Sequence, residues 1–107
     1  MKFEFSPHIA IKVRKYDDAI KFYKEVLGME IVNRKDFETH FKKDGINFYI
    51  ENDEKMPGVT FFEFKVDDVK ETLKLMEENG CVLTQVYSNK SIMMADPFGI
   101  KYHLWEK

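Results

Sequence analysis

Residues 95–107 read ADPFGIKYHLWEK, a stretch that joins a turn to a strand with two different faces. Asp96-Pro97-Phe98-Gly99 has the composition of a tight turn, because proline presets φ at the second position and glycine suits the last. After this turn, the residues IKYHLW at 100–105 alternate between two kinds of side chain, which is the period of a β-strand. The sequence therefore predicts a strand with one apolar face and an opposite face that includes His103.

The first half of the chain has a regular order of elements. HIAIKV at 8–13 alternates like a strand, and KYDDAIKFYKEVLG at 15–28 has apolar residues at helical spacing and a closing glycine. Strand candidates follow at 29–37, 39–43 and 46–51. The last two are joined across the Asp44-Gly45 dipeptide, which is a strong hairpin signal.

The second half repeats this order. VTFFEFKV at 59–66 alternates, DDVKETLKLMEENG at 67–80 is helical with Asp68 and Glu71 resembling a capping box, and three strand candidates follow at 81–87, 91–95 and 100–106. Glycines and valines at equivalent positions of the two halves lie 52 to 54 residues apart. The pattern is that of a tandem duplication.

The duplication predicts the fold class. Each half is too small to bury both faces of its own sheet, so one face must meet its helix and the other a second half. We expect a single α+β domain over residues 1–107, with module one at about 1–51, a polar linker at 52–58 and module two at about 59–107. The chain of 107 residues suits one such domain.

Bulk composition narrows the classes of function. Charged residues make up 34% of the chain at a formal net charge of −2, which gives no reason to expect nucleic-acid or membrane partners. No apolar run approaches about 18 residues, and the start, MKFEFSPHIAIKV, lacks the apolar segment of a signal peptide. Cys81 is the single cysteine, which excludes an intrachain disulfide and a cysteine zinc cluster. We expect a cytoplasmic protein.

Two segments carry a resemblance to a known family. HIAIKVRKYDDAIKFYKEVLGMEIV at 8–32 and DPFGIKYHLWE at 96–106 resemble the two signatures of the vicinal oxygen chelate superfamily. That superfamily includes glyoxalase I, methylmalonyl-CoA epimerase, extradiol dioxygenases, and the fosfomycin- and bleomycin-resistance proteins. The resemblance implies two βαβββ modules that form an incomplete barrel, with a ligand on the concave face.

The resemblance also implies four site positions. His8 matches the first, and His103, four residues beyond the turn glycine, takes the position where the family usually has a metal-binding glutamate. The duplicate of that position is Tyr49, with Glu51 on the same strand face, and the equivalent of His8 in module two is Phe61. Phe61 cannot coordinate a metal, so the set departs from the glyoxalase I pattern at three of four positions.

The implied chemistry divides into two classes. If a divalent ion (Zn, Ni, Mn or Fe) binds, its ligands are expected to be His8, His103 and Glu51, or Glu63 in place of Glu51, since these metals accept imidazole together with carboxylate. Glu51 or Glu63 would then carry a proton in a lyase, isomerase or dioxygenase reaction. The alternative is a metal-free protein that binds or sequesters a small molecule, as the bleomycin-resistance members do.

Other residues are expected to shape the site or the assembly. The predicted ligand-binding residues on the concave face are Tyr49, Phe61, Lys101 and Trp105. His40 is expected at a solvated position on an edge strand. A homodimer is expected, because short strands in a partly closed barrel leave edges and aromatic surface that a symmetric partner can cover.

Overall fold

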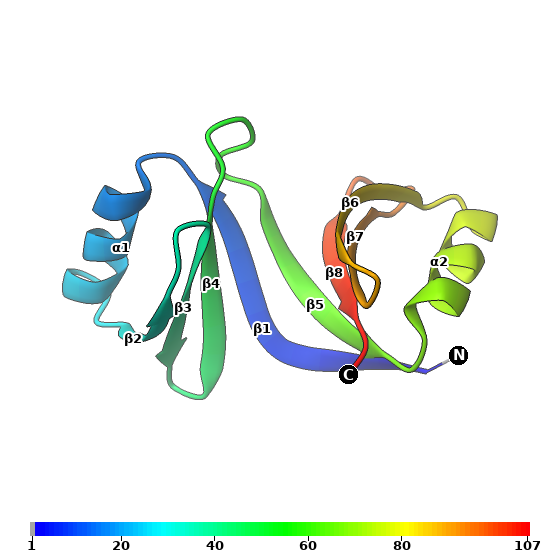
Figure 1. Cartoon of the computed structure of the whole chain (residues 1–107), viewed down its shortest axis with the longest axis horizontal. Helices are drawn as coiled ribbons and strands as arrows, with labels where there is room; N and C mark the ends of the chain where they lie inside the picture. Colours follow the sequence, from blue (N-terminus) through cyan, green and yellow to red (C-terminus); the bar gives the residue numbers. More distant parts are fainter. Residues whose placement is uncertain (1) are drawn as a thin grey trace. The chain divides into compact units, whose positions relative to one another are not determined.

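The structure is a computed structural model that describes residues 2–107, so Met1, the first residue of the expected domain, lies outside the described part. The elements in chain order are β1 (Phe3–Val13), α1 (Tyr16–Glu25), β2 (Glu30–Arg34), β3 (Glu38–Lys43), β4 (Ile46–Asn52), β5 (Thr60–Val66), α2 (Val69–Glu78), β6 (Val82–Ser88), β7 (Ser91–Ala95) and β8 (Lys101–Trp105) (Figure 1). The order strand, helix, three strands occurs twice, and the expected α+β class is confirmed. Neither helix within residues 2–107 has the length and apolar character needed to cross a membrane.

The chain divides into two compact units with the same topology. Pro7–Thr60 form the N-terminal module, and Phe61–Lys107 together with the residues up to Ser6 form the C-terminal module. The strand order is β2-β3-β4-β1 in the first and β6-β7-β8-β5 in the second. In each, the outer and inner hairpin strands pair antiparallel, while β1 with β4, and β5 with β8, pair parallel. The duplication read from the sequence is therefore a duplication of topology.

In the N-terminal module, α1 packs on one face of the sheet (Figure 1). Tyr16 and Ile20 of the helix contact Phe41 and Ile50 of the sheet, and all four side chains are buried. The Tyr16 hydroxyl shares a 2.5 Å hydrogen bond with the Thr39 hydroxyl. Burial is the main cause that raises the pKa of Tyr16, so this phenol stays neutral in the core.

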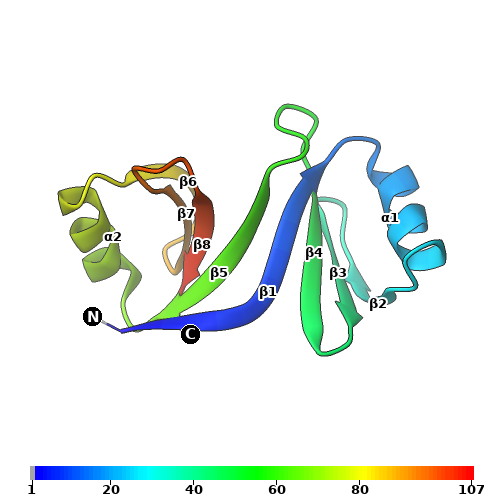
Figure 2. The ribbon, with the colours of Figure 1, turned by 180° about the vertical axis from the view of Figure 1, so that it is seen from behind.

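The C-terminal module has an equivalent core between α2 and its sheet (Figure 2). The helix begins as predicted, since the Asp68 carboxylate accepts a 3.0 Å hydrogen bond from the Glu71 backbone N–H. The buried residues of this core are Val66, Val69, Cys81, Ile92, Met94, Tyr102 and Leu104. Burial, followed by the neighbouring Cys81 thiol, raises the pKa of Tyr102 to about 12.

The two predicted turns have the expected backbone. Asp44 and Gly45 have φ angles of 50° and 80°, as a two-residue hairpin with two left-handed positions requires. The Gly99 N–H donates a 3.2 Å hydrogen bond to the Asp96 carbonyl, which closes the turn before β8. Gly99 has a φ of 88°, a conformation that side-chain-bearing residues rarely adopt.

β1 is longer than the sequence predicts. It begins at Phe3 rather than at His8, because its first residues have partners within the C-terminal module. Phe5 stacks on Phe62 at 5.3 Å between ring centroids, and the Ser6 hydroxyl donates a 3.0 Å hydrogen bond to the Glu63 carbonyl. The chain around a proline is a weak strand signal, which is why the extension was not expected.

Candidate functional site

The C-terminal module has a polar sheet face on the side opposite its helix-covered core. Alternation along the strands and the pairing of Glu63 and Met93 with His103 define this surface. We call it the His103 face, and its residues are Phe61, Glu63, Lys65, Ser91, Met93, Lys101, His103 and Trp105. Of the adjacent methionines, Met93 belongs to this face and Met94 to the core.

His103 is hydrogen-bonded through both ring nitrogens. Nδ1 lies 2.5 Å from Oε1 of Glu63, and Nε2 is hydrogen-bonded to the Ser91 hydroxyl. Glu63 is 7% exposed, so its charge is shielded from water. A carboxylate oxygen is an acceptor, so Nδ1–H of His103 is the donor to Glu63, and Nε2 and the Ser91 hydroxyl are hydrogen-bonded to each other.

Tyr87 of β6 and Trp105 of β8 place aromatic rings near this histidine. The Tyr87 ring meets the His103 ring edge-on at 5.4 Å between centroids. Trp105 lies two residues further along β8, with Nζ of Lys65 5.7 Å from the centre of its ring, and its indole N–H donates to the Ser6 hydroxyl at 3.4 Å. Lys101 is half-buried at the start of β8. Phe61 is only 2% exposed.

The N-terminal module has its own polar face, with a stack of rings. The Tyr49 ring lies between two histidines, 4.4 Å from the His40 ring in a parallel stack and 5.7 Å from the His8 ring. His40 Nε2 donates a 2.8 Å hydrogen bond to Oδ1 of Asn47. The expectation that His40 is solvated on an edge strand is wrong, because β3 lies between β2 and β4 and His40 is half-buried.

A buried lysine holds the carboxylates of the same face. Lys12 is 4% exposed, and its Nζ lies 2.9 Å from Oδ2 of Asp53 and 3.8 Å from Oε1 of Glu51. Its backbone also bonds the linker, through Lys12 N–H to the Val59 carbonyl and Gly58 N–H to the Lys12 carbonyl. This lysine therefore stabilises the position of the residues that follow β4 through its side chain and its backbone.

The Lys12–Asp53 pair predicts a pH dependence of stability. The hydrogen bond from Lys12 is the main cause that lowers the pKa of Asp53. The stabilisation of the folded state by this pair is therefore present at pH values above the ordinary aspartate pKa, near 4. It is lost as the pH falls through the lowered pKa that Asp53 has in the folded state. We expect Asp53→Asn to be less stable than wild type at neutral pH, with the difference shrinking towards acid.

Urea denaturation followed by circular dichroism at several pH values measures this difference. Asp36→Asn, which removes an exposed carboxylate, is the matched control and should leave the stability difference small at every pH. A constant difference between Asp53→Asn and wild type from neutral to acid pH would contradict the role given to this pair.

The three metal ligands that the resemblance implies, His8, Glu51 and His103, lie on β1, β4 and β8. His8 pairs with Asn47 and Glu51 with Lys12, so His8 and Glu51 are four positions apart along their strands, about 13 Å at 3.3 Å per residue. Both nitrogens of His103 are engaged. Residues 2–107 contain no group of three or more His, Cys, Asp or Glu side chains placed to hold a metal.

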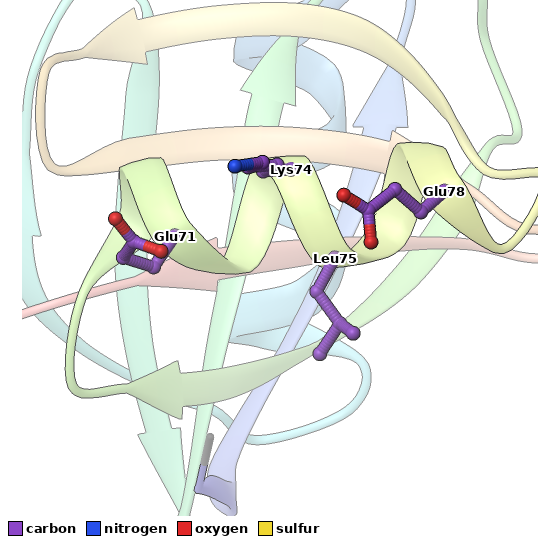
Figure 3. A pocket seen from close by; sticks show the side chains of 4 residues that line it. All are labelled: Glu71, Lys74, Leu75 and Glu78. Carbon is purple, nitrogen blue, oxygen red and sulfur yellow. The ribbon is translucent and has the colours of Figure 1, made fainter.

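A shallow depression on the outer surface of α2 is unrelated to these faces. Its lining side chains follow one stripe of the helix, Glu71, Lys74, Leu75 and Glu78 (Figure 3). They occupy i, i+3, i+4 and i+7, the solvent side of an amphipathic helix whose Val69 and Thr72 are buried. The depression contains none of the predicted site residues.

Paired βαβββ modules, each with a helix-covered core and a polar sheet face, define an α+β class of protein. The chain matches the family model described as the Glyoxalase/Bleomycin resistance protein/Dioxygenase superfamily over residues 6–104. It therefore belongs to this family, as the sequence resemblance indicated.

One similar protein has a named activity. The chain is 26% identical over 122 residues to "Probable lactoylglutathione lyase, chloroplastic" of Arabidopsis thaliana, and the match covers 94% of this chain and 35% of the plant protein. The chain thus spans about a third of the length of that relative.

Solved structures of the family share the fold. A superfamily member from Vibrio splendidus aligns with a TM-score of 0.70 at 17% identity, covering 99% of this chain and 100% of that one. Homoprotocatechuate 2,3-dioxygenase from Arthrobacter globiformis aligns with a TM-score of 0.73 at 16% identity, and the alignment covers 99% of this chain and 37% of the dioxygenase. Methylmalonyl-CoA epimerase from Mycobacterium tuberculosis aligns with a TM-score of 0.62 at 19% identity, and the alignment covers 97% of this chain and 86% of the epimerase. At these identities the likeness is one of fold.

Sequence reasoning did not single out Ser91. The residue stands two positions before Met93 in SIMMA, so strand alternation already places both on one face. What the sequence lacked was the register of β7 against β8, which pairs Met93 with His103. Without that register, a serine at the start of a strand has no distinguishing signal.

Proposed function

We propose that this chain binds a small organic molecule on the His103 face without requiring a metal ion. The observation that carries the proposal is the engagement of both His103 nitrogens, by Glu63 and by Ser91. A metal on His103 would have to break one of these hydrogen bonds, at the cost of leaving a polar group without its partner. Binding or sequestering, in the manner implied by the bleomycin-resistance resemblance, makes no such demand.

The chemistry of the His103 face suggests the class of ligand. Trp105 offers an apolar ring, and Lys65 and Lys101 bring positive charge to the same face. Aromatic surface beside a few polar groups is typical of small-molecule sites. We therefore propose a ligand with an aromatic or apolar body and an anionic group.

A metal-dependent lyase, isomerase or dioxygenase is the second candidate. It would use His8, Glu51 and His103 as ligands, with Glu51 or Glu63 carrying a proton. The names of the similar proteins favour this candidate, because they include a lyase, a dioxygenase and an epimerase. The separation of His8 from Glu51 along their strands speaks against it.

The sole tryptophan of the chain reports on the proposed site. We expect aromatic carboxylates to change the fluorescence of Trp105 in a saturable way, with the same dissociation constant in EDTA and in added Zn²⁺, Ni²⁺ or Mn²⁺. Lys65→Met should weaken binding of the carboxylate but not of its uncharged amide. Lys74→Met, on the outer surface of α2, is the matched control. Binding that appears only with a metal, and is lost in His103→Ala, would favour the metal-dependent candidate instead.

The assembly and location are proposals of the same kind. We propose a homodimer, supported by the outer strands β2 and β6, on which Val32, Val82 and Val86 are exposed. Sedimentation measures the mass directly. We also propose a single domain over residues 1–107 and a cytoplasmic location, the latter resting on the composition and the single cysteine.

A further inference from the structure

Three side chains of the C-terminal module form a continuous hydrogen-bonded chain across three neighbouring strands. Glu63 of β5 stands directly opposite His103 of β8, which explains the 2.5 Å contact between their side chains. Ser91 of β7 pairs with Trp105, so it lies diagonally across from His103 on the same face. Diagonal neighbours are within reach of a long or aromatic side chain, and the Ser91 hydroxyl meets Nε2 of His103.

The direction of the protons along this chain follows from the groups themselves. The Glu63 carboxylate accepts from Nδ1–H, which fixes the tautomer of the neutral imidazole. When the ring is neutral, Nε2 is the acceptor and the Ser91 hydroxyl is the donor to it. A serine hydroxyl is a weak nucleophile until a base takes its proton, and a base oriented by a carboxylate is the arrangement that activates it.

Burial and position distinguish Ser91 from the other serines. Ser91 is the first residue of β7, directly after a turn, and is half-buried, whereas the orienting Glu63 is buried. Ser6 donates its hydroxyl proton to a backbone carbonyl, and Ser88 accepts from the Lys90 backbone N–H. The Ser91 hydroxyl contacts a base instead.

We propose that Ser91 is a nucleophilic serine, activated by His103 and oriented through Glu63, that reacts with acyl and phosphoryl electrophiles such as small esters. This activity goes beyond the proposed binding function. In the step, Oγ of Ser91 forms a bond to the carbonyl carbon while its proton passes to Nε2 of His103. The bond from that carbon to the leaving oxygen breaks, and His103 returns the proton to that oxygen. Water then hydrolyses the acyl-serine and restores the hydroxyl.

A fluorophosphonate probe tests the proposal without knowledge of a natural substrate. Attack by Ser91 on phosphorus releases fluoride and leaves a stable phosphonyl-serine, whose mass and position peptide mass spectrometry identifies. We expect the wild-type chain to be labelled at Ser91, and Ser91→Ala to lose the label. Ser88→Ala is the matched control and should be labelled as wild type is.

The base is tested with His103→Gln and Glu63→Gln. General-base catalysis contributes roughly 100-fold or more, so the labelling rate of Ser91 should fall by about that factor in His103→Gln. Glu63→Gln should also slow labelling, since an amide does not stabilise the imidazolium and its N–H can donate to Nδ1, which favours the opposite tautomer. Labelling rates are compared only for variants whose circular dichroism spectra match wild type.

A second readout does not depend on the probe or on the folding of a variant. Nitrogen-15 NMR of wild-type histidines should show a His103 ring that is protonated at Nδ1 and unprotonated at Nε2 when neutral. Absence of label at Ser91, equal labelling rates in wild type and His103→Gln, or a His103 ring protonated at Nε2 would each overturn the proposal. Trp105 fluorescence titration is independent of all three, so failure of the binding function and failure of the serine are distinguishable.

Discussion

Phe41→Ala is expected to lower the free energy of unfolding by about 3 to 5 kcal/mol. Phe41 is 0% exposed and lies in the core beneath α1, with ring centroids 6.1 Å from Tyr23 and 6.3 Å from Phe48. Truncation removes the buried ring and leaves a cavity that the paired strands on both sides of β3 cannot fill by collapsing. A loss of this size is a large part of the 5 to 15 kcal/mol by which domains are usually stable.

Urea denaturation followed by circular dichroism measures this loss. Phe37→Ala is the matched control, because Phe37 is the same residue type but is 61% exposed. We expect it to change the free energy of unfolding by roughly 0.5 kcal/mol or less. Similar losses for the two variants would show that Phe41 is not in the core of the N-terminal module.

Glu63→Leu is expected to cost about 2 to 3 kcal/mol, in the range measured for hydrogen bonds to charged groups. The substitution leaves Nδ1–H of His103 without its acceptor on a half-buried strand position. Glu63→Gln should cost less, because the amide keeps an acceptor oxygen at the same place. Glu78→Leu, on the solvent side of α2, controls for the loss of one negative charge.

A double-mutant cycle with His103→Leu isolates the interaction. If Glu63 acts through His103, Glu63→Leu should cost much less in the His103→Leu background than in wild type, since no N–H is then left without a partner. Additive losses would show that Glu63 stabilises the chain through other contacts. Thermal or urea denaturation of the four proteins gives the coupling free energy.

Most of the local structure was predictable because it depends on residues close in sequence. The Asp44-Gly45 dipeptide specified a hairpin because its backbone needs two left-handed positions, and both occur. Asp68 specified the start of α2 because its side chain caps an amide three residues away. The start of β1 was not predictable in this way, because Phe3 and Phe5 are held by rings of β5 about sixty residues away in sequence.

For the candidate site, the sequence determined which face each side chain takes. The period of two along β8 placed His103 opposite the apolar face, and the same period along β5 placed Glu63 and Phe61 together. The repeat and the two signatures also determined the family, which the match over residues 6–104 confirms. These features follow from local geometry and from the order of elements, and both can be inferred from the amino-acid sequence.

Only the tertiary structure decided which side chains meet. The register of β5 against β8 puts Glu63 at His103, and the pairing of β7 with β8 brings Ser91 to the other ring nitrogen. In the N-terminal module, the pairing of β1 with β4 places Glu51 opposite Lys12, with which it forms an ion pair, and four positions along the strands from His8. Strand register is set by the packing of whole faces against their helices. Whether two residues 40 positions apart become partners therefore depends on the packing of both strands and cannot be inferred from either segment alone.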